Sequence, residues 1–322
     1  MRAIVQSGYG GTEVWQLGEV DRPTIADNEV LVKVHAAGLD RGTWHLMRGE
    51  PYAVRLVFGL RTPKNPVPGL DLAGVVVEVG AKVTRFAVGD EVYGIGKGSL
   101  AEYTAAREGK LVPKPEALTF EQAASVAVSG LTAVRGLCDV ARIKDGDKVL
   151  ITGASGGVGS FAVQIAKAIG AEVTGVCQTS KVDLVRRLGA DRVIDYTTDD
   201  YLEGSTKYDV ILDIGGSASL ARLRGALPPK GTLVIVGGEG GSKWGTGIGR
   251  QLKALAVSPF VKQRLTMLVA KEQASDMQRL SDFIEAGQLM PAVERTYPLA
   301  EAAVAMKALD AGEVRGKVVI AM

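Results

Sequence analysis

Cysteine and histidine are scarce in this sequence of 322 residues, which contains two of each. Cys138 and Cys177 are far apart and lie in apolar surroundings, so the sequence offers neither a disulfide framework nor a cysteine-rich zinc site. No apolar run approaches the roughly 20 residues that span a bilayer. Met1 to Gln6 has the pattern of a strand and lacks the apolar segment of a signal peptide. We therefore expect a soluble protein of the cytoplasm.

A strong excess of charge of either sign is also missing, since the formal net charge is +2. Nucleic acid and an anionic membrane surface are therefore not expected as main partners, which leaves a small-molecule substrate. Glycine is abundant, with 41 residues, and suits a fold with many tight turns. The length is sufficient for two domains that each bury a core.

The chain divides into two parts with different patterns of expected secondary structure. Residues 1–124 contain short strands separated by Gly, Pro and Asp turns, as in a small β-barrel domain; the expected strands include 29–35, 74–79, 91–94 and 99–104. Residues 125–271 alternate helices with near-continuously apolar strands, expected at 148–152, 172–177, 192–196, 209–213, 232–236 and 265–269. This alternation predicts an α/β domain with a doubly wound, parallel, six-stranded sheet.

Helices are expected near residue 124, where the sequence pattern changes, and again after residue 271. Thr119 and Gln122 form a capping-box pattern that opens a helix over 121–128, and a second helix is expected over 132–140. Residues 272–322 do not extend the alternation. They read as two helices ending at 286 and 309, an extended segment at 292–297 and a closing strand at 317–321. We expect this tail to return to the first domain.

A glycine-rich turn follows the strand at 148–152 and leads into a helix that Gly170 ends. The turn has the dinucleotide-binding pattern with alanine in its first position, and the expected cofactor contacts are Ala154, Ser155, Gly156, Gly157, Val158 and Gly159. The backbone N–H groups at the start of the helix would hold a pyrophosphate. The strand before, the helix after and the strand at 172–177 favour dinucleotide binding over a plain strand–helix turn.

NADPH is preferred over NADH as the cofactor. An NAD site usually has an acidic residue about 20 residues past the glycines, whereas the strand at 172–177 is followed by Gln178, Thr179, Ser180 and Lys181. We expect Ser180 to cap a helix and Lys181 to lie in its first turn. These two residues and Gln178 could then accommodate a 2′-phosphate. The alternative is a capped helix with a solvated lysine.

Several further motifs are familiar together: Gly38-Leu39-Asp40, Pro68 to Gly74, Val88 to Gly94, Leu131-Thr132-Ala133, Gly153 to Gly159 and Leu188 to Asp191. With them, essentially the whole chain resembles the medium-chain dehydrogenase/reductase superfamily. It looks most like the zinc-free quinone oxidoreductases and alkenal/enone reductases, including the reticulon-4-interacting-protein-like branch. The resemblance implies a GroES-like catalytic domain, a Rossmann domain, an active site in the cleft between them, and a homodimer.

The resemblance also bears on zinc. Zinc alcohol dehydrogenases of the superfamily have a catalytic Cys where this chain has Asp40, and Gly-His-Glu where it has Gly69-Leu70-Asp71. The four cysteines of the structural zinc loop are missing as well. His35 and His45 without a thiolate do not make a tetrahedral site, so we expect no zinc. Without a Lewis acid, hydride transfer favours acceptors that delocalise the charge themselves, such as quinones and α,β-unsaturated carbonyls.

The resemblance assigns roles at further positions. Asp40 and His45 replace a family Asn and Tyr and are the candidate catalytic residues, with His45 the better proton donor; a structural role in holding the turn is the alternative. The remaining candidate cofactor contacts are Thr132 near the nicotinamide, Tyr196 near the 2′-phosphate, and Ile214, Gly237 and Gly238 at strand ends.

We therefore predict a zinc-independent, NADPH-dependent reductase of quinones or activated C=C bonds. Two alternatives stay open: an enoyl-thioester reductase, and an NADPH-binding redox sensor or scaffold with little turnover. The glycine-rich segment 237–249 reads as a mobile loop, and residues 238–259 as a substrate lid, a dimer contact or a membrane contact.

Overall fold

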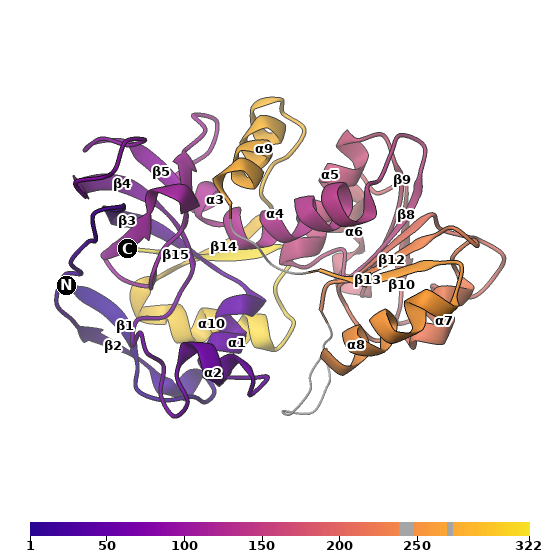
Figure 1. Cartoon of the computed structure of the whole chain (residues 1–322), viewed down its shortest axis with the longest axis horizontal. Helices are drawn as coiled ribbons and strands as arrows, with labels where there is room; N and C mark the ends of the chain where they lie inside the picture. The colour runs from indigo at the N-terminus through magenta and orange to yellow at the C-terminus, as the bar shows by residue number, and fades with distance from the viewer. Residues whose placement is uncertain (238–247, 269–272) are drawn as a thin grey trace. The chain divides into compact units, whose positions relative to one another are not determined.

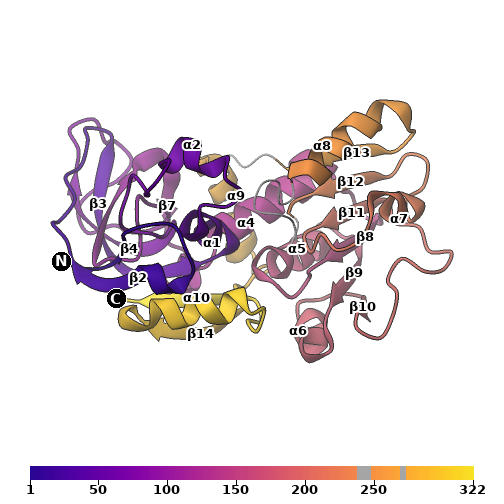
Figure 2. The ribbon, with the colours of Figure 1, turned by 90° about the horizontal axis from the view of Figure 1, so that it is seen from below.

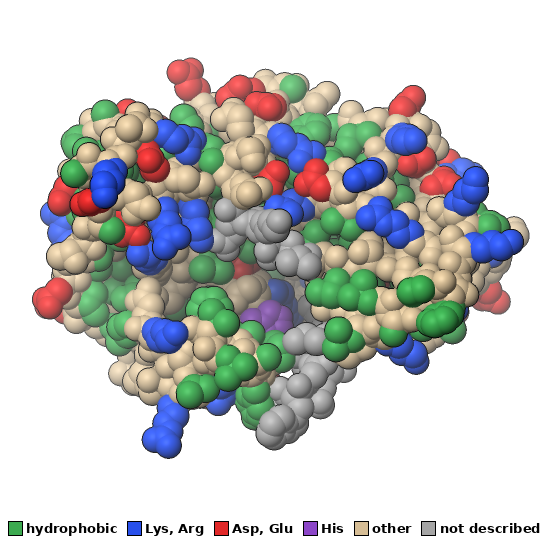
Figure 3. All heavy atoms as spheres, in the orientation of Figure 1, with side chains coloured by type: hydrophobic (Ala, Val, Ile, Leu, Met, Phe, Trp, Pro, Cys, Tyr) green, Lys and Arg blue, Asp and Glu red, His purple; other side chains and the backbone are tan. Residues whose placement is uncertain are grey.

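The computed structural model describes residues 1–237, 248–268 and 273–322. The chain forms two compact units (Figure 1). Unit 1 comprises Met1–Leu131, Glu272–Glu285 and Met290–Met322, and unit 2 comprises Thr132–Lys271 and Ala286–Leu289. None of the helices described is long and apolar enough to cross a membrane. On the face drawn in Figure 3, acidic and basic side chains are both present, in keeping with the small net charge.

Unit 2 is built on a parallel sheet of six strands in the order β10-β9-β8-β11-β12-β13 (Figure 2). The strands are β8 (Lys148–Thr152), β9 (Glu172–Cys177), β10 (Arg192–Asp195), β11 (Val210–Asp213), β12 (Thr232–Ile235) and β13 (Arg264–Met267). The order reverses between β8 and β11, which is the topological switch point of a doubly wound sheet. The predicted fold class is confirmed, and each strand lies within two residues of its expected bounds where the structure describes it.

Helices connect the strands of unit 2. They are the π-helix η3 (Arg135–Ala141), α5 (Gly157–Ala168), η4 (Thr179–Lys181), α6 (Val182–Arg187), α7 (Leu220–Gly225), α8 (Ile248–Val257) and η5 (Ser258–Phe260). Gly170 follows α5 with φ +95°, the left-handed conformation expected after a helix end. A core of apolar side chains from β8, β11, β12, α7 and α8 includes Leu150, Ile211, Leu223 and Ala254.

Unit 1 contains a sheet in the order β14-β15-β3-β4-β5-β7, with β6 paired to β3, and a separate hairpin β1-β2. The strands are β1 (Arg2–Gln6), β2 (Trp15–Glu19), β3 (Glu29–Leu39), β4 (Asp71–Val79), β5 (Glu91–Ile95), β6 (Tyr103–Arg107), β7 (Leu111–Pro113), β14 (Val293–Pro298) and β15 (Lys317–Ala321). Strand β15 pairs antiparallel with β3, so the end of the chain completes the sheet formed by its first part.

The helices of unit 1 are short and lie around this sheet. They are η1 (Thr12–Val14), α1 (Arg41–Arg48), α2 (Val54–Phe58), η2 (Glu108–Lys110), α3 (Phe120–Ala124), α4 (Ala127–Val134, which ends in unit 2), α9 (Ala274–Glu285), η6 (Leu299–Glu301) and α10 (Ala302–Asp310). Both halves of the predicted capping box are present at Thr119 and Gln122. The apolar face of α10 packs on Ile4, Leu39 and Ile320.

Some elements of unit 1 differ from expectation. The first helix ends at Ala124 because the Ser125 hydroxyl donates to the Gln122 carbonyl at 2.7 Å, and α4 then starts at Ala127. The strand expected at 99–104 begins at Tyr103, because the N–H groups of Ser99 and Leu100 bond to the segment 68–69 instead. Helix α1 was not expected, and Asp40 caps it.

A buried ion pair fixes β15 against β4 and α4. Lys317 and Asp71 are each at most 1% exposed, and Lys317 Nζ lies 3.4 Å from Asp71 Oδ2 and donates to Ser129 Oγ at 3.1 Å. The other carboxyl oxygen of Asp71 accepts the Val128 N–H at 2.7 Å. Burial raises the pKa of Asp71 from 3.8 to about 7, against the opposing effect of Lys317. One carboxyl group thus joins β4 to β15 and to α4.

Replacement of Lys317 by methionine is expected to lower the free energy of unfolding by about 3–5 kcal/mol, because it leaves a buried carboxylate without its cation. Urea denaturation at pH 8 measures the loss. The double variant D71N/K317M removes both charges and is expected to recover most of it; a double variant as unstable as K317M contradicts the assignment.

Asp71 also gives a pH dependence. Between pH 3.8 and about 7 the folded protein holds the Asp71 proton more tightly than the unfolded chain does, so the stabilising contribution of this residue declines as the pH rises through that window. Urea denaturation at several pH values is expected to show this decline in the natural chain and not in D71N.

Candidate functional site

The glycine-rich turn after β8 opens α5 as the sequence predicts. Gly153 has φ +69°, a left-handed conformation that favours glycine, and the Gly156 N–H bonds back to the Gly153 carbonyl at 3.0 Å. Gly156 is the N-cap of α5, with no side chain to satisfy the first N–H groups of the helix. Those N–H groups, at Gly157, Val158 and Gly159, form the positive end of a helix of 12 residues. The turn can therefore bind an anion.

The glycines of the turn differ in how much space a side chain would have at each position. A Cβ on Gly159 would lie 2.1 Å from the Gly153 oxygen and 2.6 Å from Ala154 Cα, so close packing inside the chain excludes any side chain there. A Cβ on Gly156 would make one ordinary contact, 3.5 Å from the Gly153 oxygen, and its φ of −85° suits any residue. The open side of Gly156 leaves room for a ligand to approach the backbone. Ala154 and Ser155, which belong to the turn, are buried.

A hydroxyl group joins the two strands at the switch point. Thr152 Oγ1, at the end of β8, donates to Asp213 Oδ1 at the end of β11 (2.8 Å) and accepts the N–H groups of Ile214 and Gly215 at 3.0 and 3.1 Å. Asp213 is fully buried, and its other carboxyl oxygen contacts Arg250 of α8 at 2.5 Å. Neither Thr152 nor Arg250 was predicted from the sequence, because α8 also contains Gln251 and Lys253 and its arginine did not stand out.

The residues expected near a 2′-phosphate follow β9. Gln178, not Ser180, is the N-cap residue here, and its side-chain amide donates to Ser180 Oγ at 3.1 Å. The expected capping role of Ser180 is therefore wrong, because the chain first makes the short 3-10 helix η4. Ser180 is exposed, whereas Lys181 is 8% exposed and lies where η4 meets α6.

Asp195, which the sequence analysis did not single out, lies beside Cys177 in the register of β10 and β9. Its Oδ1 accepts the backbone N–H and the hydroxyl of Thr197 at 2.9 and 2.7 Å, and Thr197 bonds to Thr179 at 3.0 Å. Hydrogen bonds from Thr179 and Thr197 lower the pKa of Asp195. The carboxylate thus fixes the loop that begins η4. Tyr196 is 54% exposed at the end of β10, open to a ligand.

The other expected cofactor contacts are placed as follows. Thr132 is half-buried on α4, Ile214 directly follows β11, and Gly237 lies two residues after the end of β12. An ideal Cβ on Gly237 would lie 3.6 Å from the Ile214 oxygen, so these two strand ends are close together. Gly238 and residues up to 247 of the expected loop lie outside the described residues.

Asp40 has a structural role in α1. Its Oδ1 accepts the Thr43 N–H at 2.7 Å, which satisfies one of the free donors at the helix start. The residue is 6% exposed, and Oδ2 is buried without a hydrogen-bond partner in the part of the chain that the structure describes. Its charge contributes to the raised pKa of Asp71. The structural alternative for Asp40 is thus observed, and a catalytic role stays a prediction.

His45 lies one turn further along α1. Its Nδ1 is 2.8 Å from the Glu50 carbonyl oxygen, so Nδ1 carries the proton and Nε2 is the ring nitrogen left for another group. Burial lowers the pKa of His45, and at neutral pH the ring is therefore uncharged. An uncharged ring with this tautomer accepts a proton at Nε2 and must first be protonated to donate one.

The positions that bind zinc in zinc alcohol dehydrogenases have side chains here that do not suit a zinc ion. Asp71 is paired with the ammonium of Lys317, and Asp40 caps α1. Over residues 1–237, 248–268 and 273–322, no group of three or more His, Cys, Asp or Glu side chains is arranged to hold a metal ion. A buried ammonium repels a divalent cation, so these residues do not fit zinc.

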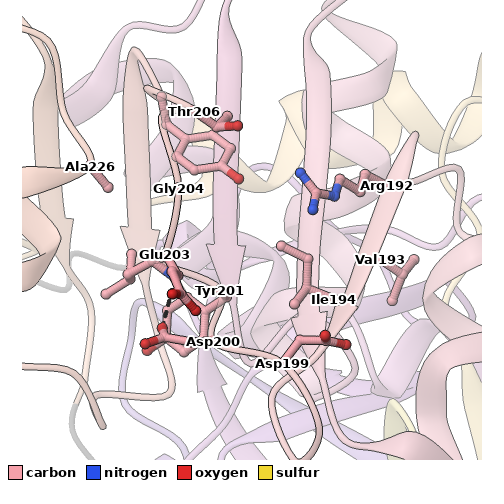
Figure 4. A pocket seen from close by; sticks show the side chains of 12 residues that line it. Arg192, Val193, Ile194, Asp199, Asp200, Tyr201, Glu203, Gly204, Thr206 and Ala226 are labelled. Atoms are coloured by element: carbon pink, nitrogen blue, oxygen red, sulfur yellow. Dashed lines mark hydrogen bonds between the residues drawn. The ribbon is translucent and has the colours of Figure 1, made fainter.

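A cavity of about 340 Å³ lies in unit 2 away from the predicted site residues (Figure 4). It is lined by the first residues of β10 and by the connection between β10 and β11, including Arg192, Asp199, Asp200 and Glu203. None of the residues predicted to bind a cofactor or to act in catalysis lines this cavity.

Two family models match the chain. The alcohol dehydrogenase GroES-like domain matches residues 26–116, and the zinc-binding dehydrogenase model matches residues 188–320.

Comparison with individual proteins extends the similarity to almost the whole chain. The chain is 31% identical to a chloroplast envelope quinone oxidoreductase homolog of Arabidopsis thaliana, over 99% of this chain and 98% of that protein. It is 33% identical to a chloroplastic NADPH-dependent alkenal/one oxidoreductase of the same plant, over 99% and 79%. The crystal structure of Escherichia coli quinone oxidoreductase complexed with NADPH superimposes with a TM-score of 0.85 at 26% identity, covering 100% of both chains. The chain therefore belongs to the medium-chain dehydrogenase/reductase superfamily, among its quinone oxidoreductases and alkenal/enone reductases.

Proposed function

We propose that this protein is an NADPH-dependent oxidoreductase that reduces quinones or the activated C=C bonds of α,β-unsaturated carbonyl compounds without zinc. Unit 1 with its C-terminal strands is the catalytic domain, and unit 2 binds the cofactor. The names of the relatives support both the cofactor and the acceptor classes.

The observation that carries the proposal is the turn at Gly156. The backbone there is open on the side where a Cβ would lie, and the N–H groups of the following helix have no capping side chain. These features fit a dinucleotide pyrophosphate held by backbone donors. A bound NADPH supplies the hydride, and the exposed groups after β9 and β10, at Ser180 and Tyr196, are the proposed contacts of the adenosine half.

The choice of acceptor follows from the groups around Asp71. The Asp71–Lys317 pair is fully buried and both charges have partners, so it offers no open position for a metal. Acceptors that spread the developing charge over their own conjugated system need no Lewis acid. His45 Nε2 and Asp40 Oδ2 are the proposed sites of proton exchange with the product, and the pKa of His45 favours a solvent-derived proton at neutral pH.

A homodimer in the cytoplasm remains our proposal for assembly and location, supported by the resemblance and the sequence composition. Relatives include chloroplastic and mitochondrial proteins. Sedimentation equilibrium tests the dimer, and fractionation of the source cells tests the location.

Steady-state NADPH oxidation against a panel of acceptors tests the proposed reaction. The panel contains 1,4-benzoquinone, 9,10-phenanthrenequinone, an alkyl vinyl ketone, 2-hexenal and crotonyl-CoA, with and without a chelator. We expect turnover of a quinone or an enone that the chelator does not change. Preference for crotonyl-CoA would favour the enoyl-thioester alternative. Tight NADPH binding with no turnover of any acceptor would favour a sensor or scaffold.

Gly156→Ala and Gly159→Ala are expected to affect different properties, the first cofactor binding and the second stability. The methyl group on Gly156 fits the chain but occupies the approach of the pyrophosphate, so the Kd for NADPH should rise at least about tenfold with an unchanged melting temperature. The methyl group on Gly159 collides with backbone atoms and should lower stability by about 1–3 kcal/mol. Fluorescence titration and calorimetry measure the two effects. Unchanged binding in Gly156→Ala would argue against the pyrophosphate site.

Lys181→Ala is expected to raise the Michaelis constant for NADPH roughly tenfold or more while changing that for NADH little, because a charge-assisted bond to the 2′-phosphate is lost. The exposed Lys230 of unit 2 provides a matched control, and Lys230→Ala should change neither constant. Equal increases for both cofactors in Lys181→Ala would remove Lys181 from the phosphate site.

A further inference from the structure

Arg250 is the most unusual charged residue of unit 2. It lies in α8 with a side chain 18% exposed, and its Nε and Nη2 atoms are buried without a hydrogen-bond partner in the described part of the chain. Its Nη1 atom lies 2.5 Å from Oδ2 of the fully buried carboxylate of Asp213. Buried donors without acceptors are rare in folded proteins because each costs free energy. A residue of this kind calls for a ligand or a structural explanation.

The surroundings of Arg250 indicate a ligand. Asp213, which contacts it, accepts a hydrogen bond from the hydroxyl of Thr152, the residue immediately before the glycine-rich turn. An ideal Cβ on Gly153 would lie 3.3 Å from the Gly215 nitrogen, so the turn touches the segment after β11. Two side chains, those of Asp213 and Thr152, therefore link the guanidinium to the turn proposed to bind pyrophosphate.

The position of Asp213 and Arg250 relative to the sheet indicates which part of a dinucleotide they could contact. Asp213 lies opposite Thr152 on β8 and Ile235 on β12 in the parallel register, at the carboxyl ends of the strands where such sheets bind ligands. Strands β11 to β13 form the second mononucleotide-binding half, away from the η4 region that follows β9. A guanidinium has several donors in one plane, and one carboxylate leaves donors available for the oxygens of a phosphate.

We propose that Arg250 binds the pyrophosphate of a bound dinucleotide from the nicotinamide side, and that Asp213 holds the guanidinium in position. The inference rests on the proposed NADPH site and adds a residue outside the glycine-rich turn to it. Thr152 positions Asp213 through its hydroxyl, so the residues Thr152, Asp213 and Arg250 act as one unit that connects α8 to the turn.

Arg250→Met tests the proposal by equilibrium binding of three compounds. NADPH and 2′-phospho-ADP-ribose contain the pyrophosphate, whereas 2′,5′-ADP contains the 2′-phosphate without it. We expect the Kd values of the first two compounds to rise at least tenfold and that of 2′,5′-ADP to stay within twofold. Arg250→Lys should recover part of the loss. Unchanged binding of NADPH, or an equal loss for all three compounds, would overturn the proposal.

Arg222→Met is the matched control, because it removes an arginine of unit 2 whose ion pair with Asp200 is exposed. All three Kd values should stay unchanged in this variant. Arg250→Lys keeps a cation beside the buried carboxylate of Asp213 and gives a second test should Arg250→Met fail to fold. Its Kd values for NADPH and 2′-phospho-ADP-ribose should rise, and its Kd for 2′,5′-ADP should stay within twofold. Three unchanged Kd values would also overturn the proposal.

These outcomes separate the two proposals. If the natural chain fails to bind NADPH, the proposed cofactor is wrong. If it binds NADPH and Arg250→Met binds equally well, the cofactor stands and the role of Arg250 is refuted.

Discussion

The site of unit 2 depends on one shared hydroxyl group. Thr152 donates to Asp213 and accepts two backbone N–H groups that follow β11, so it fixes the distance between the two strands at the point where the strand order reverses. The glycine-rich turn starts at the next residue. Its left-handed Gly153 and the tight contact of Gly159 with Gly153 then determine where α5 begins. A displacement of the β11 end would move the turn and the helix N-terminus together.

Unit 1 has a different kind of constraint, since it buries charge. The Asp71–Lys317 pair joins residues distant in the sequence, and each partner has a further bond, to Val128 and Ser129. In the zinc enzymes of the superfamily, this region of the chain provides metal ligands. In this chain the carboxyl group of Asp71 is paired with an internal ammonium, that of Lys317. Asp40, which caps α1, is close enough to this pair for its charge to contribute to the raised pKa of Asp71.

Much of the fold could be predicted from local patterns. The strands of the parallel sheet are apolar on both faces and are bounded by turn residues, and the closing strand at 317–321 has its expected bounds. The glycine-rich turn was predictable because its residues are adjacent in sequence. Helix α1 and the break at Ser125 were not predicted, because a single side-chain bond at Asp40 or Ser125 decides where those helices begin or end. Patterns of hydrophobicity carry no signal for such bonds.

The sequence alone determined the two-domain organisation, the glycine-rich turn and the absence of the usual zinc ligands, since each depends on the identity of neighbouring residues. Tertiary structure decided which distant polar groups meet. It placed Lys317 against Asp71 and Arg250 against Asp213, and it removed Ser180 from the capping position in favour of Gln178. Pairing of buried charges depends on how strands and helices pack in three dimensions, and residues 246 positions apart in the chain share no local pattern that reveals it.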